Sequence, residues 1–171
     1  GVYIIDTDVI AHRITEKGEE CLKELADYFG NDILNVDGTL NRKELAKRAF
    51  SKESEKTVLN RITHKYIKEE TIRLIEQTDS DIVGIDGAVI IGSNIQPLCE
   101  FIVSVISEKE VRMQRLRERD NLSDEQINLR LSAQPDDKFY IENSLYIIYN
   151  NGDLKELQRQ AQQLYKRIKE V

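Results

Sequence analysis

Acidic residues follow two apolar segments of the chain, at points where strands of a sheet would end. Asp6 and Asp8 come directly after the apolar run 2–5, and Asp86 ends the segment 81–86. In an open parallel sheet, ligands bind outside the carboxyl ends of the strands. Asp8 is also placed to cap the helix predicted to follow. We expect a catalytic or metal-linked role for the Asp6–Asp8 pair; the alternative is a helix cap beside a solvated acid.

Arginines supply the second group of candidate residues. Arg112, Arg115 and Arg119 are spaced three and four residues apart, so they share one side of a predicted helix, and Arg130 follows. Guanidinium groups match phosphate oxygens in geometry. Arginines on a helix are also a common solvated face, and nearby glutamates favour that alternative. Acids and arginines without a covalent nucleophile suit phosphoryl transfer, which depends on positioning, Mg²⁺ and charge neutralisation.

Other chemistries find little support in the sequence. His64 stands alone in a predicted helix, and two Cys with two His are too dispersed for a zinc site. Neither a serine nucleophile elbow nor the phosphate-loop motif G-x-x-x-x-G-K-[ST] occurs in the 171 residues. The sequence enters a predicted strand directly after Gly1, so we expect it to begin in mid-domain, just after such a loop.

Composition describes one globular domain, 1–171, long enough to bury a core. Hydrophobic residues make up 40% and charged residues 33%, which excludes a disordered chain. The net charge of −6 argues against a general nucleic-acid binder, and no apolar run is long enough to span a membrane. Cys21 and Cys99 lie far apart and are predicted to be reduced core thiols, which indicates a cytoplasmic protein.

Strands are predicted over 2–5, 81–86, 101–106 and 146–149, alternating with helical segments. This order predicts an α/β fold with a mainly parallel sheet. Helical periodicity covers 8–29, as two helices or one kinked helix, then 42–50, 52–77, 107–120, 123–133 and 153–171, where Leu154 is among the inward residues. Asn41 and Ser51 are predicted helix caps, and Ser107 with Glu110 and Ser123 with Gln126 are predicted capping boxes. The paired helical segments before residue 80 predict a helical lobe beside the sheet.

Six short motifs occur in order along nearly the whole chain. They are IDTDVIA (5–11), DGTLNR (37–42), ITH (62–64), RDNLS (119–123), Arg130 followed by Ala133-Gln134, and NNG (150–152). Together they resemble the I-D-A-D-x-I-A, D-G-x-L-x-R, x-T/L-H-P, R-D-x-x-S…R-I-x-x-Q and N-x-G motifs of the dephospho-CoA kinase family. Members of that family phosphorylate the ribose 3′-hydroxyl of dephospho-CoA, using ATP.

The resemblance implies a P-loop kinase fold whose parallel sheet is flanked by helices. It also implies a CoA-side helical lobe at about 30–80, a lid at about 112–140, and a central P-loop strand that is absent from this sequence. Without that strand and loop, these 171 residues alone are expected to be inactive. We also expect the four strands not to form one continuous sheet, and self-association through the incomplete sheet.

The same resemblance assigns roles to individual residues. Asp8 becomes the leading candidate for the base, with Asp6 second, and Arg119 for charge neutralisation on the transferred phosphate. Residues on the substrate side are His12, Arg42, His64 and Asp86; those on the nucleotide and phosphate side are Arg115, Arg130, Asn150 and Gly152. ATP and Mg²⁺ are the implied cofactors, and no protein residue is assigned as a direct metal ligand.

The sequence departs from the family pattern at five positions, which are His12, Lys65, Ala88, Gly92 and Tyr149. Gly92 and Tyr149 favour an alternative, a non-catalytic relative that binds CoA-like ligands or a partner. A third possibility is a phosphatase of the haloacid dehalogenase type, because Asp6-Thr7-Asp8 imitates its D-x-D motif. There a Gly-Thr pair should follow the second acid, whereas Val9 and Ile10 follow here, so this reading is disfavoured.

Overall fold

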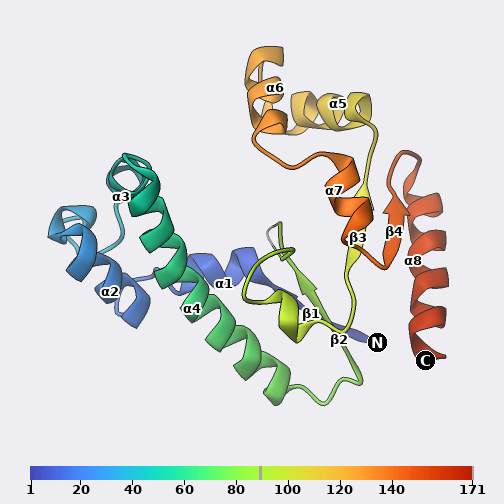
Figure 1. The fold of residues 1–171 in the computed structure, drawn as a ribbon, viewed down its shortest axis with the longest axis horizontal. Helices are drawn as coiled ribbons and strands as arrows, with labels where there is room; N and C mark the ends of the chain where they lie inside the picture. The colour runs from blue at the N-terminus through green and yellow to red at the C-terminus, as the bar shows by residue number, and fades with distance from the viewer. Residues whose placement is uncertain (89, 171) are drawn as a thin grey trace. The chain divides into compact units, whose positions relative to one another are not determined.

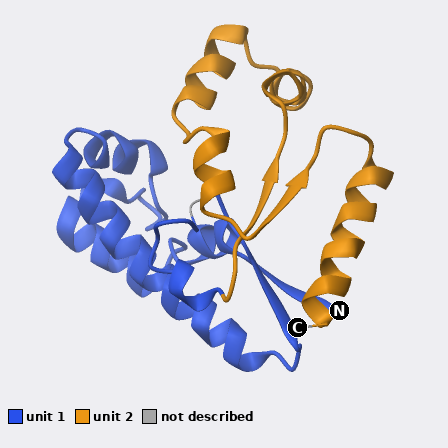
Figure 2. Cartoon of the chain, turned by 45° about the vertical axis from the view of Figure 1, so that its right-hand side comes forward, with its two compact units in different colours: residues 1–99 blue, residues 100–171 orange. Residues whose placement is uncertain are grey.

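The chain forms two compact units in a computed structural model, residues 1–99 and 100–171 (Figure 2). The structure describes residues 1–88 and 90–170. Each unit contains a pair of parallel strands with helices (Figure 1). The α/β class predicted from the sequence is confirmed.

The first unit is built on β1 (Val2–Asp6) and β2 (Ile82–Asp86), which pair in parallel. Four helices lie between them in sequence: α1 (Thr7–Arg13), α2 (Glu20–Phe29), α3 (Arg42–Ala49) and α4 (Glu53–Gln77). Short 3₁₀ turns, η1 (Asn31–Ile33) and η2 (Gln96–Leu98), follow α2 and β2. The long helix α4 packs against α1, α2 and α3.

Burial explains why the helices of this unit assemble around α4. Ile10 and Ile14 of the first helical segment, Leu25 and Phe29 of the second, and Ile62 of α4 are all buried in one cluster. These positions follow the apolar period predicted from the sequence. The segment 8–29 forms two helices rather than one kinked helix. Burying each such side chain contributes roughly 1.5–3 kcal/mol, so the cluster fixes the elements that carry the first acids.

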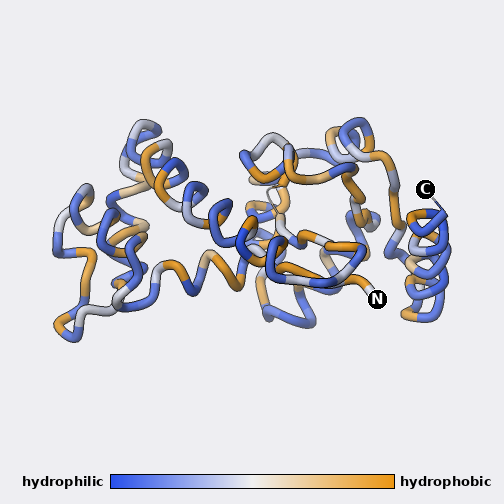
Figure 3. Tube along the Cα trace, turned by 90° about the horizontal axis from the view of Figure 1, so that it is seen from below, coloured by the Kyte–Doolittle hydropathy of each residue, from blue (hydrophilic) through white to orange (hydrophobic). Residues whose placement is uncertain are grey.

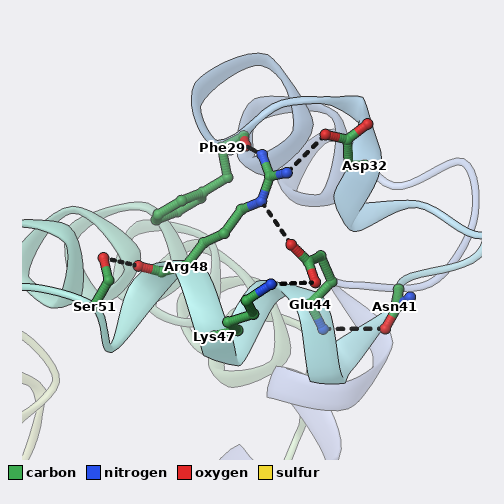
Figure 4. A network of polar contacts seen from close by, with 7 residues as sticks. All are labelled: Phe29, Asp32, Asn41, Glu44, Lys47, Arg48 and Ser51. Atoms are coloured by element: carbon green, nitrogen blue, oxygen red, sulfur yellow. Dashed lines mark hydrogen bonds and ion pairs between the residues drawn. The ribbon is translucent and has the colours of Figure 1, made fainter.

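Arg48 joins three segments of the helical part of this unit (Figure 4). Its guanidinium donates to the Phe29 carbonyl at the end of α2, to Asp32 Oδ2 in η1 (2.7 Å) and to Glu44 Oε1 in α3 (3.1 Å). Asn41 caps α3 as predicted, with Oδ1 accepting from the Glu44 amide (3.1 Å). The end of α2, η1 and α3 are thereby held together.

The predicted cap at Ser51 is wrong. The Ser51 hydroxyl donates to the Arg48 carbonyl (2.7 Å) at the end of α3. Lys52 takes the cap position of α4, with no side-chain hydrogen bond to the helix amides. The hydroxyl satisfies a free carbonyl behind it instead of a free amide ahead of it.

The second unit pairs β3 (Val103–Ile106) with β4 (Tyr146–Tyr149) in parallel. Helices α5 (Lys109–Asp120), α6 (Asp124–Ser132) and α7 (Asp137–Glu142) come between the strands, and α8 (Leu154–Lys169) follows β4. The short α7 was not predicted; Asp136 caps it by accepting from the Phe139 amide (2.9 Å). Apolar residues recur along α8 between polar ones (Figure 3). Leu154 at the start of α8 is 67% exposed, so the prediction that it faces inward is wrong.

The four strands form two separate two-stranded sheets. Each unit contains one of these sheets, and the prediction that the four strands would not make one continuous sheet stays a prediction. Both cysteines are free, as predicted. Burial raises the pKa of the Cys21 thiol to about 12, so it remains a thiol near neutral pH and has little nucleophilic character. Over the described ranges, the helices are too short or too polar to cross a membrane.

Candidate active site

The pairing of β1 with β2 places two of the predicted acids side by side. Asp6 and Asp86 are register partners and are the last residues of their strands. Because the strands are parallel, both carboxylates leave the sheet at the same edge, where ligands of α/β proteins bind. We call Asp6, Asp8 and Asp86 the carboxylate edge. All three are exposed to solvent.

The cap of α1 is Asp6, and the prediction that Asp8 caps this helix is wrong. Helix α1 begins at Thr7, and Asp6 Oδ1 accepts hydrogen bonds from the amides of Asp8 (2.9 Å) and Val9 (3.0 Å). Two acids separated by one residue can both be caps by spacing, and the cap lies two residues earlier than predicted. Asp8 therefore lies in the first turn, and its carboxylate accepts no hydrogen bond from the described residues.

Asp8 borders a small pocket of about 90 Å³ within the first unit. Its walls come from α1, α4 and the loop after β2, and include Ala11, His64 and Asn94. Asn94 Nδ2 donates to the His64 carbonyl (3.1 Å) and ties that loop to α4. The structure thus brings together Asp8 and His64, which the sequence only listed separately.

His12 and Arg42, two predicted substrate-side residues, are hydrogen-bonded to each other. Arg42 Nη2 lies 3.0 Å from His12 Nδ1 and 3.2 Å from Thr15 Oγ1. A guanidinium can only donate, so Nδ1 of His12 is the acceptor and its proton is on Nε2. The contact joins the end of α1 to the start of α3 and presents two nitrogen donors on an exposed surface.

In the second unit, Asp120 holds two of the predicted arginines. Arg119 Nε and Nη2 donate to its two carboxylate oxygens (2.7 and 3.0 Å), and Arg130 Nη1 donates to Oδ2 (2.6 Å). The hydrogen bonds from Arg119, and to a smaller extent the one from Arg130, lower the pKa of the Asp120 carboxyl. Exposed ion pairs add little stability, but this one gathers the positive charges of α5 and α6. We call it the arginine cluster.

The corner between α5 and α6 determines where this cluster lies. Asn121 ends α5 in the left-handed region (φ 50°), which Asn tolerates better than most residues. Ser123 and Gln126 then form the predicted capping box that starts α6. Arg117 also bridges the corner through Asp124 (2.7 Å). Arg112, on the predicted arginine side of α5, is bound to Asp137 (2.8 Å).

Two nucleotide-side residues lie together at the carboxyl ends of β3 and β4. Arg115 Nη2 donates to Asn150 Oδ1 (3.2 Å), and Arg115 Nη1 donates to Ser107 Oγ (3.3 Å). Gly152 is exposed in the bend just beyond. The predicted capping box of Ser107 and Glu110 is wrong, because the Ser107 hydroxyl donates to the Asn150 carbonyl (2.9 Å) and Glu108 takes the cap position. Ser107 was not among the predicted site residues. Its place directly after β3 is the sequence feature that could have indicated it.

Oxygen atoms dominate the carboxylate edge, and nitrogen donors dominate the arginine cluster. In residues 1–88 and 90–170, no three His, Cys, Asp or Glu side chains gather as a metal cage. Carboxylates in ones and twos, with water, are the usual protein contribution to a Mg²⁺ site. Acids at strand ends and arginines on a separate helical corner are parts that phosphoryl transfer uses.

Comparisons with known proteins agree with this chemistry. The family model for dephospho-CoA kinase matches residues 1–156. Dephospho-CoA kinase of Corynebacterium efficiens is 35% identical over 98% of this chain and 86% of its own length. Dephospho-CoA kinase of Idiomarina loihiensis is 30% identical over 98% of this chain and 83% of its own length.

Solved structures share the fold. A crystal structure from Thermus thermophilus superposes with a TM-score of 0.80 at 23% identity, covering 98% of this chain and 85% of that one. Dephospho-CoA kinase from Campylobacter jejuni gives a TM-score of 0.67 at 22% identity, with the same coverage. Given the family match over most of its length and these sequence identities, the chain belongs to the dephospho-CoA kinase family.

Proposed function

We propose that this protein transfers the γ-phosphoryl group of ATP to the ribose 3′-hydroxyl of dephospho-CoA, giving coenzyme A. The substrates are small molecules, and the proposed place of action is the cytoplasm, where ATP is supplied and the free thiols of Cys21 and Cys99 stay reduced. Family membership supports the reaction, and the division into carboxylates and arginines supports the mechanism.

One observation carries the assignment of the base. Asp8 borders a pocket beside His64, and its carboxylate accepts no hydrogen bond from the described residues. One carboxylate oxygen of Asp6, in contrast, accepts the hydrogen bonds that cap α1. A general base must reach the proton that it removes. In the proposed mechanism, Asp8 takes the proton of the 3′-hydroxyl as that oxygen attacks the γ-phosphorus, and the bond from the γ-phosphorus to the bridging oxygen breaks to release ADP.

Mg²⁺ fits the remaining carboxylate oxygens of the edge. Asp6 and Asp86 are adjacent in register and would hold the ion through its water shell, a role that replaces the substrate-side role that the resemblance implied for Asp86. Bound there, it would neutralise charge on the phosphate oxygens. Arg42 and His64, on the helical lobe at about 30–80, and His12 in α1 are proposed to contact the CoA substrate.

The arginine cluster is proposed to be the phosphate-neutralising part of a lid at about 112–140. Arg119 and Arg130 are gathered by Asp120 and exposed, with 71% and 55% of their side-chain surface accessible. A phosphate can therefore reach them without unfolding the corner. Arg115, Asn150 and Gly152 are proposed to contact the nucleotide at the carboxyl ends of β3 and β4.

The first prediction tests the reaction itself. The intact protein, mixed with ATP, Mg²⁺ and dephospho-CoA, should produce coenzyme A and ADP in equal amounts, measured by mass spectrometry and a coupled ADP assay. Binding of dephospho-CoA in a calorimeter without any coenzyme A formation would replace the kinase by a non-catalytic binding protein. Release of phosphate from simple phosphate monoesters would instead support a phosphatase.

The second prediction separates the two acids. Asp8→Asn in the intact protein should lower kcat by about 10²–10⁴, the usual contribution of a general base, while ATP affinity stays nearly unchanged. Asp6→Asn is the matched control, because Asn caps a helix about as well as Asp; it should mainly raise the Mg²⁺ concentration needed for half-maximal rate. Steady-state kinetics over a Mg²⁺ series measures both, and the reverse pattern would exchange the two roles.

The third prediction concerns the arginine cluster. Arg119→Ala and Arg130→Ala should each lower kcat on the order of 10²–10³-fold, the typical effect of losing one transition-state contact. The KM for dephospho-CoA should change little. Lys109→Ala serves as the control, because Lys109 is an exposed cation on the same helix, at the end away from the cluster. An unchanged kcat in the Arg119 and Arg130 variants would leave them as solvated surface residues.

The fourth prediction is self-association. Within residues 1–88 and 90–99 of the first unit, β1 pairs only with β2, so that unit leaves backbone groups unpaired along the other edge of β1, and Ile4 on this strand is 58% exposed. Such edges favour pairing between copies. Sedimentation velocity should show dimers or larger species that grow with concentration and decrease in Ile4→Lys. Val36→Lys, at an exposed loop position, should not change them. A monomer at every concentration would rule the association out.

A further inference from the structure

Thr7 lies at the centre of the carboxylate edge and is buried. It stands between Asp6 and Asp8 in the chain, and only 9% of its surface is exposed. Its hydroxyl donates to the backbone carbonyl of Asp86 (2.9 Å), at the end of the neighbouring strand. One side chain therefore connects the segments that carry all three acids.

The other buried threonines make a different kind of bond. Thr15 Oγ1 donates to the His12 carbonyl (2.9 Å), and Thr71 Oγ1 donates to the Ile67 carbonyl (2.7 Å). Both acceptors lie three or four residues earlier, a common way for a threonine within or at the end of a helix to satisfy its hydroxyl. Thr7 instead reaches a residue 79 positions away. Its hydroxyl holds two strand ends together rather than satisfying itself locally.

Gly87 closes the same contact from the other side. A Cβ added at this glycine would lie 2.1 Å from Thr7 Oγ1 and 3.4 Å from Thr7 Cβ. The first distance is far below any real contact. The φ of Gly87 is not among the positive values in the chain, so a turn does not require the glycine. Close approach of the Thr7 hydroxyl requires it.

We propose that Thr7 and Gly87 form a positioning pair that fixes the carboxylates for phosphoryl transfer, an inference that rests on the proposed function. The hydroxyl occupies the space that a side chain at residue 87 would need, and its bond holds the end of β2 against the start of α1. Neither residue contacts the reacting atoms; both act through Asp6, Asp8 and Asp86. Displacement by about 1 Å can cost an enzyme on the order of 10²-fold in rate.

Conservative changes at Thr7 test the positioning role. Thr7→Val replaces the hydroxyl by a methyl group, which cannot donate and needs more room beside the Asp86 carbonyl. In the intact protein, Thr7→Val should lower kcat on the order of 10–10²-fold, with the KM values for ATP and dephospho-CoA within about twofold of wild type. Thr7→Ser keeps the hydroxyl and should have a kcat close to that of the wild type. Thr71→Val is the matched control, another buried threonine, which should alter the melting temperature but not kcat.

A double-variant cycle tests the steric half of the pair without relying on activity. Gly87→Ala should lower the melting temperature sharply, because the new methyl group meets the Thr7 hydroxyl. Thr7→Ala combined with Gly87→Ala should melt at a higher temperature than Gly87→Ala alone, since the obstructing atom is gone. Neighbouring sites that interact deviate from additivity in this way.

The outcomes separate the two proposals. If the wild-type protein forms coenzyme A but Thr7→Val keeps full kcat, or if the shifts in melting temperature simply add, the positioning pair is refuted and the kinase stands. If the wild-type protein forms no coenzyme A, the proposed function fails. The non-additive melting temperatures then still decide whether Thr7 and Gly87 interlock.

Discussion

Parallel pairing of β1 with β2 is the constraint on which the first unit depends. It puts Asp6 opposite Asp86 and brings the start of α1 to the loop after β2. A shift of one residue in this register would turn every side chain to the other face of the strand and separate the two acids. The buried cluster around Ile5, Ile10 and Ile62 resists such a shift, because it would expose apolar side chains. The strand register that buries the apolar cluster is therefore also the register that places Asp6 opposite Asp86.

Patterns of short range were readable from the sequence. The strand ends, the cap at Asn41 and the capping box of Ser123 and Gln126 each depend on a few neighbouring residues, and all are present. Caps at Ser51 and Ser107 were wrong because each hydroxyl found a carbonyl acceptor, and spacing cannot tell which free backbone group wins. Asp6 and Asp8 presented the same ambiguity one residue apart.

Contacts between distant segments were beyond reach of the sequence. The Asp8–His64 pocket and the Thr7–Asp86 bond depend on how α1, α4 and the loop after β2 pack, and no local pattern encodes that. Asp120 was visible beside Arg119, yet its bond to Arg130 needs the corner at Asn121. The roles assigned to these residues came from resemblance to a family; the geometry supplies physical reasons why they could fill them.

The two groups of candidate residues differ in the length of chain that must close to assemble them. Arg130 reaches Asp120 across 10 residues, whereas Thr7 reaches Asp86 across 79. The entropy of loop closure grows with loop length, and distant contacts form more slowly. The arginine corner can therefore take shape early, on its own, from a capping box and an adjacent ion pair. The carboxylate edge exists only after most of the first unit has folded, so its acids become aligned in the same step that completes the core.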